Sequence, residues 1–165
     1  MNNIWVTSDT HFNHTNIIKY CNRPFLSSLE MDQVIINNWN NVIDNDDLVF
    51  HLGDFAFGLE SVGLSILSKL KGKKILIRGN HDRDKIYNSN LWLNRFNEYQ
   101  FEHYDIKINM SHYPQEQFNL DEIYLHGHSH GNLGAVRGNI IDVGVDCWEF
   151  KPINLDNLLN KGVQV

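Results

Sequence analysis

Short apolar runs alternate along the chain with longer segments whose apolar residues recur at helical spacing. The run IWVTS at residues 4–8 is rich in β-branched residues and is bounded by polar positions, which favours a strand. Runs of similar character recur further along the chain. We therefore expect strands at Ile4–Ser8, Leu48–Leu52, Lys74–Ile77, Ile106–Met110, Ile123–Leu125 and Asn139–Val143.

The clearest helix signal follows residues 27–30. The sequence SSLE at these positions has the form of a capping box, in which a serine and a glutamate satisfy the first backbone amides of a helix. Beyond it, the apolar residues at positions 35, 36, 39, 42 and 43 recur at helical spacing. Further helices are expected at Thr15–Tyr20, Glu60–Leu70, Asn90–Asn97 and Leu155–Leu159.

Strands that alternate with helices indicate an α/β layered fold. The chain has 165 residues, which fits one domain spanning residues 1–165. In α/β folds, the loops at the carboxyl ends of strands carry the ligands. Residues with binding or catalytic chemistry are therefore expected directly after the strands.

Composition narrows the class of protein. No apolar run approaches the roughly 20 residues of a membrane span, and the N-terminus lacks a basic segment followed by an apolar block, so no secretory signal is expected. Cys21 and Cys147 stand far apart and form no CxxC pair, which favours reduced thiols in the cytoplasm. The net charge of −6 argues against long-range attraction to nucleic acid, although bound cations would weaken that argument.

Five predicted strands end at Asp, Asn or His residues. Each motif has an ordinary explanation by itself, since Asp-x-His is common and Gly-Asp or Gly-Asn often forms a turn. Their joint occurrence, each after a strand, points to metal binding, because these side chains are metal ligands. The motifs are Asp9 and His11, Gly53-Asp54, Gly79-Asn80-His81-Asp82, Ser111-His112, and the run HGHSH at residues 126–130.

This order of motifs, from Asp9 to His130, resembles the calcineurin-like metallophosphoesterase superfamily. The stretches DTHFNHTNIIKYCNRPF, HLGDFAFG and SHYP are similar to those of a small prokaryotic and phage-type branch. The resemblance implies a four-layer αββα sandwich of two mixed β-sheets flanked by helices, with a dinuclear metal site in loops at strand ends.

The resemblance also implies a role for each motif residue. Asp9, His11 and His130 would bind a first metal ion, and Asp54 would bridge it to a second. The second ion would be bound by Asn80, His112 and His128. Gly127 would let the backbone approach the ions closely, and His126, nearer the strand, is expected to be structural.

The expected cofactors are two divalent metal ions. Carboxylate, amide and imidazole ligands without a thiolate suit Mn, Fe, Zn, Ni or Co, while calcium prefers more oxygen ligands. Such a pair would lower the pKa of a shared water, whose hydroxide would attack phosphorus in line. The resemblance makes His81 the acid or the transition-state stabiliser, and Asp82 is expected to orient its imidazole, to cap the following helix, or both.

Other residues leave alternatives open. Asn13 and His14 are candidates for the substrate pocket, and Arg23 either grips a phosphate through its guanidinium or is a surface residue without that role. Core or structural roles are favoured for His51, Phe55, Phe57 and Arg78. The aromatic residues between Asp84 and Asp105 either contact a nucleobase or, as we favour, form a small core; they are Tyr87, Trp92, Phe96, Tyr99 and Phe101.

The function expected from these features is hydrolysis of small phosphodiesters, with cyclic nucleotides or other nucleotide derivatives as candidates. Phosphomonoesters, a nuclease acting on DNA or RNA, and a non-catalytic scaffold are the alternatives. The expected partner is a small phosphate ester; nucleic acid is an alternative that is not favoured, and no membrane is expected. The sequence leaves the oligomeric state, the native metal and the physiological substrate open.

Overall fold

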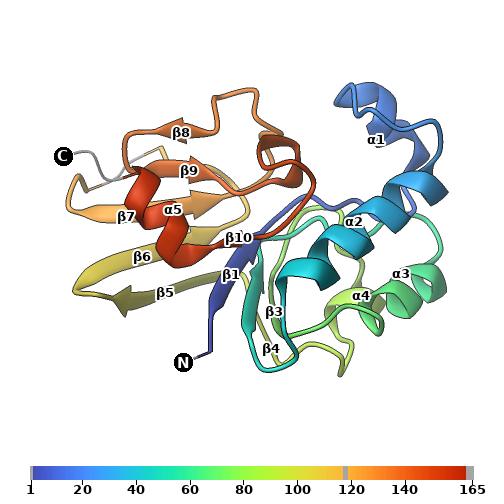
Figure 1. Ribbon diagram of the computed structural model, residues 1–165, viewed down its shortest axis with the longest axis horizontal. Coiled ribbons are helices and arrows are strands. Elements are labelled where there is room, and N and C mark those ends of the chain that lie inside the picture. The colour runs from blue at the N-terminus through green and yellow to red at the C-terminus, as the bar shows by residue number, and fades with distance from the viewer. Residues whose placement is uncertain (1, 117–118, 163–165) are drawn as a thin grey trace.

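The computed structural model describes residues 2–116 and 119–162 and contains two five-stranded β-sheets (Figure 1). The first sheet has the strand order β10-β1-β2-β3-β4, and the second has the order β5-β6-β7-β9-β8. The strands of the first sheet are β1 (Ile4–Thr7), β2 (Leu48–His51), β3 (Lys73–Ile77), β4 (Asn94–Phe96) and β10 (Ile153–Asn154). Those of the second are β5 (Glu98–His103), β6 (Ile106–Ser111), β7 (Glu122–His126), β8 (Val136–Arg137) and β9 (Ile140–Asp142).

Both sheets are mixed. In the first, β1 to β4 run parallel and β10 pairs antiparallel with β1. In the second, β6, β7 and β9 run parallel, while β5 and β8 pair antiparallel at the two edges. The predicted class, two mixed sheets with flanking helices, is confirmed. All six predicted strands are present, each within one residue of its predicted bounds.

The helices lie mainly on the first sheet, on the side away from the second sheet (Figure 1). The predicted start of α2 is confirmed: the Ser27 side chain accepts the Glu30 amide at 3.2 Å, and the Glu30 carboxylate accepts the Leu26 amide at 2.8 Å. The helices are α1 (Thr15–Tyr20), α2 (Ser28–Val42), α3 (Glu60–Leu67), α4 (Asp84–Tyr87), a 3-10 turn at Val145–Cys147, and α5 (Leu155–Gly162). None of the described helices has the length and apolar character needed to cross a membrane.

Two hydrophobic clusters form the core. One lies between the first sheet and α2, α3 and α4, and includes the fully buried Trp39 and Phe55. The other lies between the two sheets and includes Leu52 and Leu125. The aromatic residues of segment 84–105 pack in or against these clusters, which confirms the core interpretation. His51 is also buried, and its Nε2 lies 2.9 Å from the Thr10 hydroxyl.

One predicted helix is wrong. Residues 90–97 contain the short strand β4, whose residues 94–96 pair with β3. Trp92 is buried, its indole N–H donates to the Ile86 carbonyl, and the next amide, of Leu93, donates to Lys74. A three-residue strand is too short to show an alternating pattern, so sheet pairing decided this segment.

Candidate metal centre

The loops after five strands meet at one edge of the two sheets. Parallel strands place their carboxyl ends on the same side, so the loops after β1, β2 and β3 lie together. Backbone hydrogen bonds join the first two loops, from Asp9 to the Gly53 carbonyl and from His11 to the Asp54 carbonyl, both at 3.0 Å. Across the sheets, the His112 ring Nδ1 lies 2.8 Å from the Leu52 carbonyl. The edge therefore collects residues from both sheets.

The first ligand group consists of Asp9, His11 and His130. Their ligand atoms lie within 4.8 Å of one another. Asp9 Oδ1 and His11 Nε2 are buried and have no hydrogen-bond partner in the described part of the chain. An unpaired buried polar atom costs free energy, roughly 1–3 kcal/mol, and a cation in contact with both atoms would remove that cost. The residues therefore fit a metal ion.

The second ligand group consists of Asp54, His112 and His128, whose ligand atoms also lie within 4.8 Å of one another. The Asn80 carbonyl oxygen joins them, at 3.0 Å from His112 Nε2 and 3.1 Å from His128 Nδ1. Asp54 Oδ2 lies 3.5 Å from His11 Nε2 and 3.6 Å from His112 Nε2. This carboxylate oxygen therefore stands between the two groups, where a bridging ligand is needed.

Burial and neighbouring groups together set the charges of the first ligand group. It raises the pKa of the Asp9 carboxyl to about 8, an effect that His130 opposes and Asp54 reinforces. Burial, with the neighbouring positive charges of His130 and Arg23, holds the pKa of His11 well below its usual range. Burial alone would lower the pKa of His130, but its hydrogen bonds to Asp146 and Cys21 and the nearby charge of Asp9 together outweigh that effect and raise the pKa to about 10. A divalent cation would instead favour an ionised Asp9.

Five of the seven predicted ligands have backbone conformations that L-residues rarely adopt. Their φ angles lie between 47° and 66°, in the left-handed region. The two histidines of the GHSH segment both bend in this way, which brings both rings to the site as expected. The five residues are Asp9, His11, Asp54, His128 and His130.

Gly127 makes the close approach of these loops possible, as predicted. A Cβ atom at this position would lie 2.0 Å from the Ser8 hydroxyl and 2.5 Å from Asp9 Oδ2. The next residue, His128, donates its backbone N–H to the same Asp9 oxygen at 2.9 Å. Glycine is therefore required here, because any side chain would separate the two ligand-bearing loops.

Arg23 does not face the substrate side, and neither role considered for it from the sequence is correct. Its side chain is fully buried and donates from Nε and Nη2 to the two oxygens of Asp146, both at 2.8 Å. It also donates to the carbonyls of Asp9 and Thr10. Asp146 in turn lies 2.8 Å from His130 Nδ1. Arg23 and Asp146 thus connect the loop of Asp9 to the ring of His130.

Asp146 was not predicted from the sequence. It follows the predicted strand Asn139–Val143 by three residues, so the rule that placed the other site residues after strands would have found it. A third cluster of possible ligands contains Cys21 with His130 and Asp146. We assign no ion to this cluster, because the Arg23 guanidinium already occupies both oxygens of Asp146.

Asp82 does not orient the His81 ring, contrary to expectation. Its carboxylate accepts backbone N–H groups from Asp54, Phe55 and Gly79 at 2.8–2.9 Å. The side chain is buried and holds together the loops after β2 and β3. It does not cap α4 either, because that helix begins after Arg83 and has no side-chain cap. The sequence does not show that three backbone amides, from two different loops, would all donate to this one carboxylate.

His81 lies at the exposed side of the site. Its backbone N–H donates to Asp54 Oδ1 at 2.8 Å, and its ring centroid lies 5.5 Å from that of His11. His14 lies nearby: its Nδ1 is 3.1 Å from His11 Nδ1, and its ring stacks on Phe57 with centroids 4.1 Å apart. Phe57 thus borders the site, unlike the buried core residue Phe55.

The remaining predicted residues have structural contacts. The Asn13 backbone N–H donates to the Asp32 carboxylate, and its side-chain amide donates to the Phe57 carbonyl at 3.2 Å. His126 is buried, with Nδ1 2.7 Å from the Gly127 carbonyl, which agrees with a structural role. Arg78 pairs with Asp84 at 2.6 Å, as favoured from the sequence.

Comparison with known proteins identifies the family. The domain model of the calcineurin-like phosphoesterase superfamily matches residues 2–143. The chain belongs to this superfamily. An uncharacterized protein of Methanocaldococcus jannaschii is 36% identical over 176 residues, covering 98% of this chain and 94% of that protein. The Gene 66 protein of Mycobacterium phage L5 is 26% identical, covering 90% of this chain and 88% of its own length.

Solved structures share the fold of this calcineurin-like protein. A protein of unknown function from Aquifex aeolicus aligns with a TM-score of 0.78 and 25% identity, over 98% of this chain and 99% of that one. An archaeal phosphodiesterase aligns with a TM-score of 0.50 and 19% identity, over 86% of this chain and 81% of that one. At this level of identity the second alignment supports the fold alone.

Proposed function

We propose that this calcineurin-like protein is a metal-dependent phosphodiesterase that acts on small phosphate diesters. The observation that carries the proposal is the position of Asp54 Oδ2, which lies between the two ligand groups at 3.5 and 3.6 Å from a histidine of each. Membership of a phosphoesterase superfamily supports the reaction class, hydrolysis of a phosphate ester.

Two divalent ions are the cofactors in this proposal. The first ligand group would hold one ion, the second ligand group with Asn80 would hold the other, and Asp54 would contact both. When bound, such a pair lowers the pKa of water and neutralises charge on phosphate oxygens. Manganese, iron, zinc, nickel and cobalt all suit a set of imidazole, carboxylate and amide ligands.

Other residues of the chain position the ligand groups and provide a proton for the reaction. Arg23 and Asp146 hold the His130 ring, and Asp82 holds the loop of Asp54, so the ligand groups are arranged before substrate binds. We assign the exposed imidazole of His81 as the group that faces the leaving oxygen of the substrate. Its ring nitrogen would carry a proton to that oxygen as the ester bond breaks. The bond from its backbone to Asp54 keeps this ring beside the ligand groups.

A diester is favoured over a monoester because the site is open. His81 and His128 are both exposed, and a cleft extends from the second ligand group past Tyr113. A phosphate with two substituents needs space on both sides of phosphorus. The net charge of −6 disfavours long nucleic acid strands as substrates.

The experiment is a metal add-back assay. The protein is stripped with chelator, supplied with Mn²⁺, Ni²⁺, Zn²⁺ or Mg²⁺, and assayed with bis-p-nitrophenyl phosphate and p-nitrophenyl phosphate at neutral pH. We expect metal-dependent turnover with the diester faster than the monoester. Asp54→Ala should abolish nearly all turnover, and His103→Ala is the matched control, because His103 pairs with Asp156 outside the site.

Other outcomes would change the proposal. Faster turnover of the monoester would make the protein a phosphatase. An Asp54→Ala variant that kept most of the rate with its metal still bound would refute the bridging assignment. A folded protein that binds two ions but turns over neither ester would have a binding function instead.

A further inference from the structure

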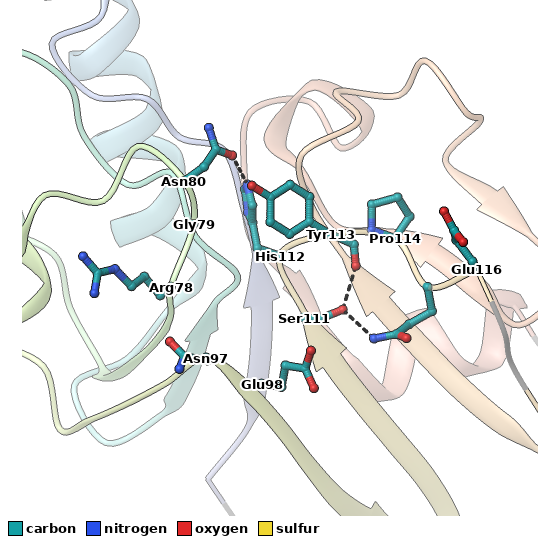
Figure 2. Close-up of a pocket in the computed structure, with 11 residues that line it drawn as sticks. Arg78, Gly79, Asn80, Asn97, Glu98, Ser111, His112, Tyr113, Pro114 and Glu116 are labelled. Carbon is teal, nitrogen blue, oxygen red and sulfur yellow. Dashed lines mark hydrogen bonds between the residues drawn. The ribbon is translucent and has the colours of Figure 1, made fainter.

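A cleft of about 720 Å³ opens beside the second ligand group (Figure 2). Asn80 and His112, which belong to the candidate metal centre, form part of its wall, and Asn97, Glu98 and Tyr113 form other parts. The cleft is therefore continuous with the place where a phosphate would be held. The residues that line the cleft should determine which substituent of the phosphate the cleft accepts.

Tyr113 provides an aromatic surface next to the ligand groups. The residue is 52% exposed, and its ring centroid lies 5.1 Å from that of His112 and 4.6 Å from that of His128. Its backbone is held in place because its carbonyl accepts the Ser111 hydroxyl at 2.7 Å (Figure 2). A half-exposed ring on an anchored backbone is suited to stacking against a planar group of a ligand.

The charge of the cleft is negative. Glu98 and Glu116 both line it. Arg78 also lines it, but its guanidinium donates to Asp84 at 2.6 Å and lies 4.6 Å from the centre of the Tyr87 ring. Figure 2 shows this side chain extending away from Tyr113. A second phosphate entering the cleft would meet these carboxylates, and among the described lining residues the one cation, Arg78, is already paired, so its entry is unfavourable.

Asn97, Ser111 and Gln115 give the cleft neutral hydrogen-bonding side chains. The Asn97 amide is exposed, and the Gln115 amide donates to the Ser111 hydroxyl at 3.3 Å. Amides and hydroxyls bind the edges of heteroaromatic rings and sugar hydroxyls. An aromatic face, neutral polar groups and excess negative charge together match an uncharged aromatic substituent.

We propose that this cleft binds the nucleoside part of a nucleotide diester, with Tyr113 stacking on the base and Glu98 excluding a second phosphate. The inference deepens the proposed phosphodiesterase function and rests on it, because one phosphate must be held at the ligand groups. It identifies the substrate class as diesters with one phosphate and a nucleoside substituent. Continuous nucleic acid, whose next phosphate would approach Glu98, is disfavoured.

Binding measurements test this inference without requiring turnover. The Mn²⁺-loaded protein is titrated by calorimetry with inorganic phosphate, adenosine 5′-monophosphate and adenosine 3′,5′-bisphosphate, and each nucleotide is checked intact afterwards. We expect the monophosphate to bind at least about ten-fold more tightly than inorganic phosphate and about five-fold more tightly than the bisphosphate. The difference between the two nucleotides should shrink as ionic strength rises.

Substitutions at Tyr113 and Glu98 test whether these two residues cause the differences in affinity. Tyr113→Ala should bring the affinity for the monophosphate close to that for inorganic phosphate, and Tyr113→Leu, which keeps an apolar side chain without an aromatic face, should do the same. Glu98→Lys should strengthen bisphosphate binding about five-fold and change monophosphate binding less than two-fold. Tyr104→Ala and Glu102→Lys are matched controls, because both residues are exposed and neither lines the cleft.

Two results would overturn the inference. One is equal affinity of the wild-type protein for inorganic phosphate and the monophosphate. The other is an equal effect of Glu98→Lys and Glu102→Lys, which would show only long-range attraction. The phosphodiesterase proposal fails separately, through absence of diester turnover in the add-back assay, since the calorimetry gives its answer whether or not turnover occurs.

Discussion

At the scale of the residue, the candidate metal centre depends on side chains whose backbone is strained. Asp9, His11 and Asp54 all have positive φ, which costs on the order of 1–3 kcal/mol per residue and persists only where the surroundings require it. Here the surroundings are paired loops and close glycine contacts. The residue types were readable in the sequence, but this conformation was not, because nothing local favours it.

His81 should be dispensable for metal binding and required for rate. His81→Ala removes an exposed ring and keeps the backbone bond to Asp54, so the metal content should stay the same. With a poor leaving group the rate should fall about 10²–10⁴-fold, the usual contribution of a general acid. With p-nitrophenolate, which leaves without a proton, the rate should stay near that of the wild type. An equally large loss with both leaving groups would indicate charge stabilisation instead.

At the scale of the element, buried carboxylates join segments that are distant in sequence. Asp82 connects the loops after β2 and β3, and Asp146 connects the 3-10 turn to Arg23 and His130. Sequence spacing identified the loops by their position after strands. It did not identify these connections, because each depends on which backbone amides and charges are left without partners after the sheets pair.

Asp146 should control affinity at the first ligand group. Asp146→Asn weakens the anchor of the His130 ring and leaves the Arg23 charge buried without its partner. We expect metal affinity at this group to fall about 10–100-fold, as for other groups that orient a metal-binding histidine. Metal titration followed by elemental analysis measures this, and binding of the second ion should change little.

A double variant separates positioning from stability. Breaking a buried ion pair costs about 3–5 kcal/mol, while replacing both partners by apolar residues is often neutral. Arg23→Met with Asp146→Leu should therefore recover much of the stability that Asp146→Asn loses. Metal affinity should remain low, because His130 still lacks its acceptor. Recovery of both properties would show that Asp146 acts only through stability.

Asp47 should make the anchoring of β1 depend on pH. Burial opposes its ionisation, but hydrogen bonds from Asp44, Asn3 and Trp5 outweigh burial and lower its pKa. A carboxyl whose folded pKa is depressed stabilises the protein above the unfolded pKa, near 3.9, and loses that contribution as pH falls through the folded value.

A comparison of the wild-type protein with Asp47→Asn tests whether this contribution to stability is lost as pH falls. The variant should be less stable by about 1–3 kcal/mol between pH 5 and 8, and the difference should shrink below about pH 4. Urea unfolding at several pH values measures it. Asp46→Asn is the matched control: its side chain is 81% exposed, so its effect should stay within about 0.5 kcal/mol. A difference that grew on acidification would contradict the assignment.

At the scale of the whole molecule, metal binding should be coupled to folding. The two ligand groups combine loops of both sheets, so they exist only when the sheets are packed together. A ligand at about 100 times its dissociation constant adds about 2.7 kcal/mol of stability. For a protein of this size that corresponds to a rise in Tm of about 5–10 °C.

Thermal unfolding of chelator-treated protein, with and without added Mn²⁺, measures this coupling. Asp9→Asn should lose the part of the rise that the first ion contributes, because it removes the buried carboxylate of the first ligand group. A Tm that does not change with Mn²⁺ would show that the ligand groups do not bind the ion in the folded protein.

The sequence by itself determined six of the ten described strands, most helices and the residues of the two ligand groups. Apolar runs specify strands locally, and the Asp, Asn and His residues directly after them mark the edge where parallel strands end. Tertiary structure alone decided the strand at residues 94–96, the burial of Arg23 and the role of Asp82. Each of these depends on which backbone groups and charges need a partner once the sheets have formed, and that need arises between segments that are distant in the chain.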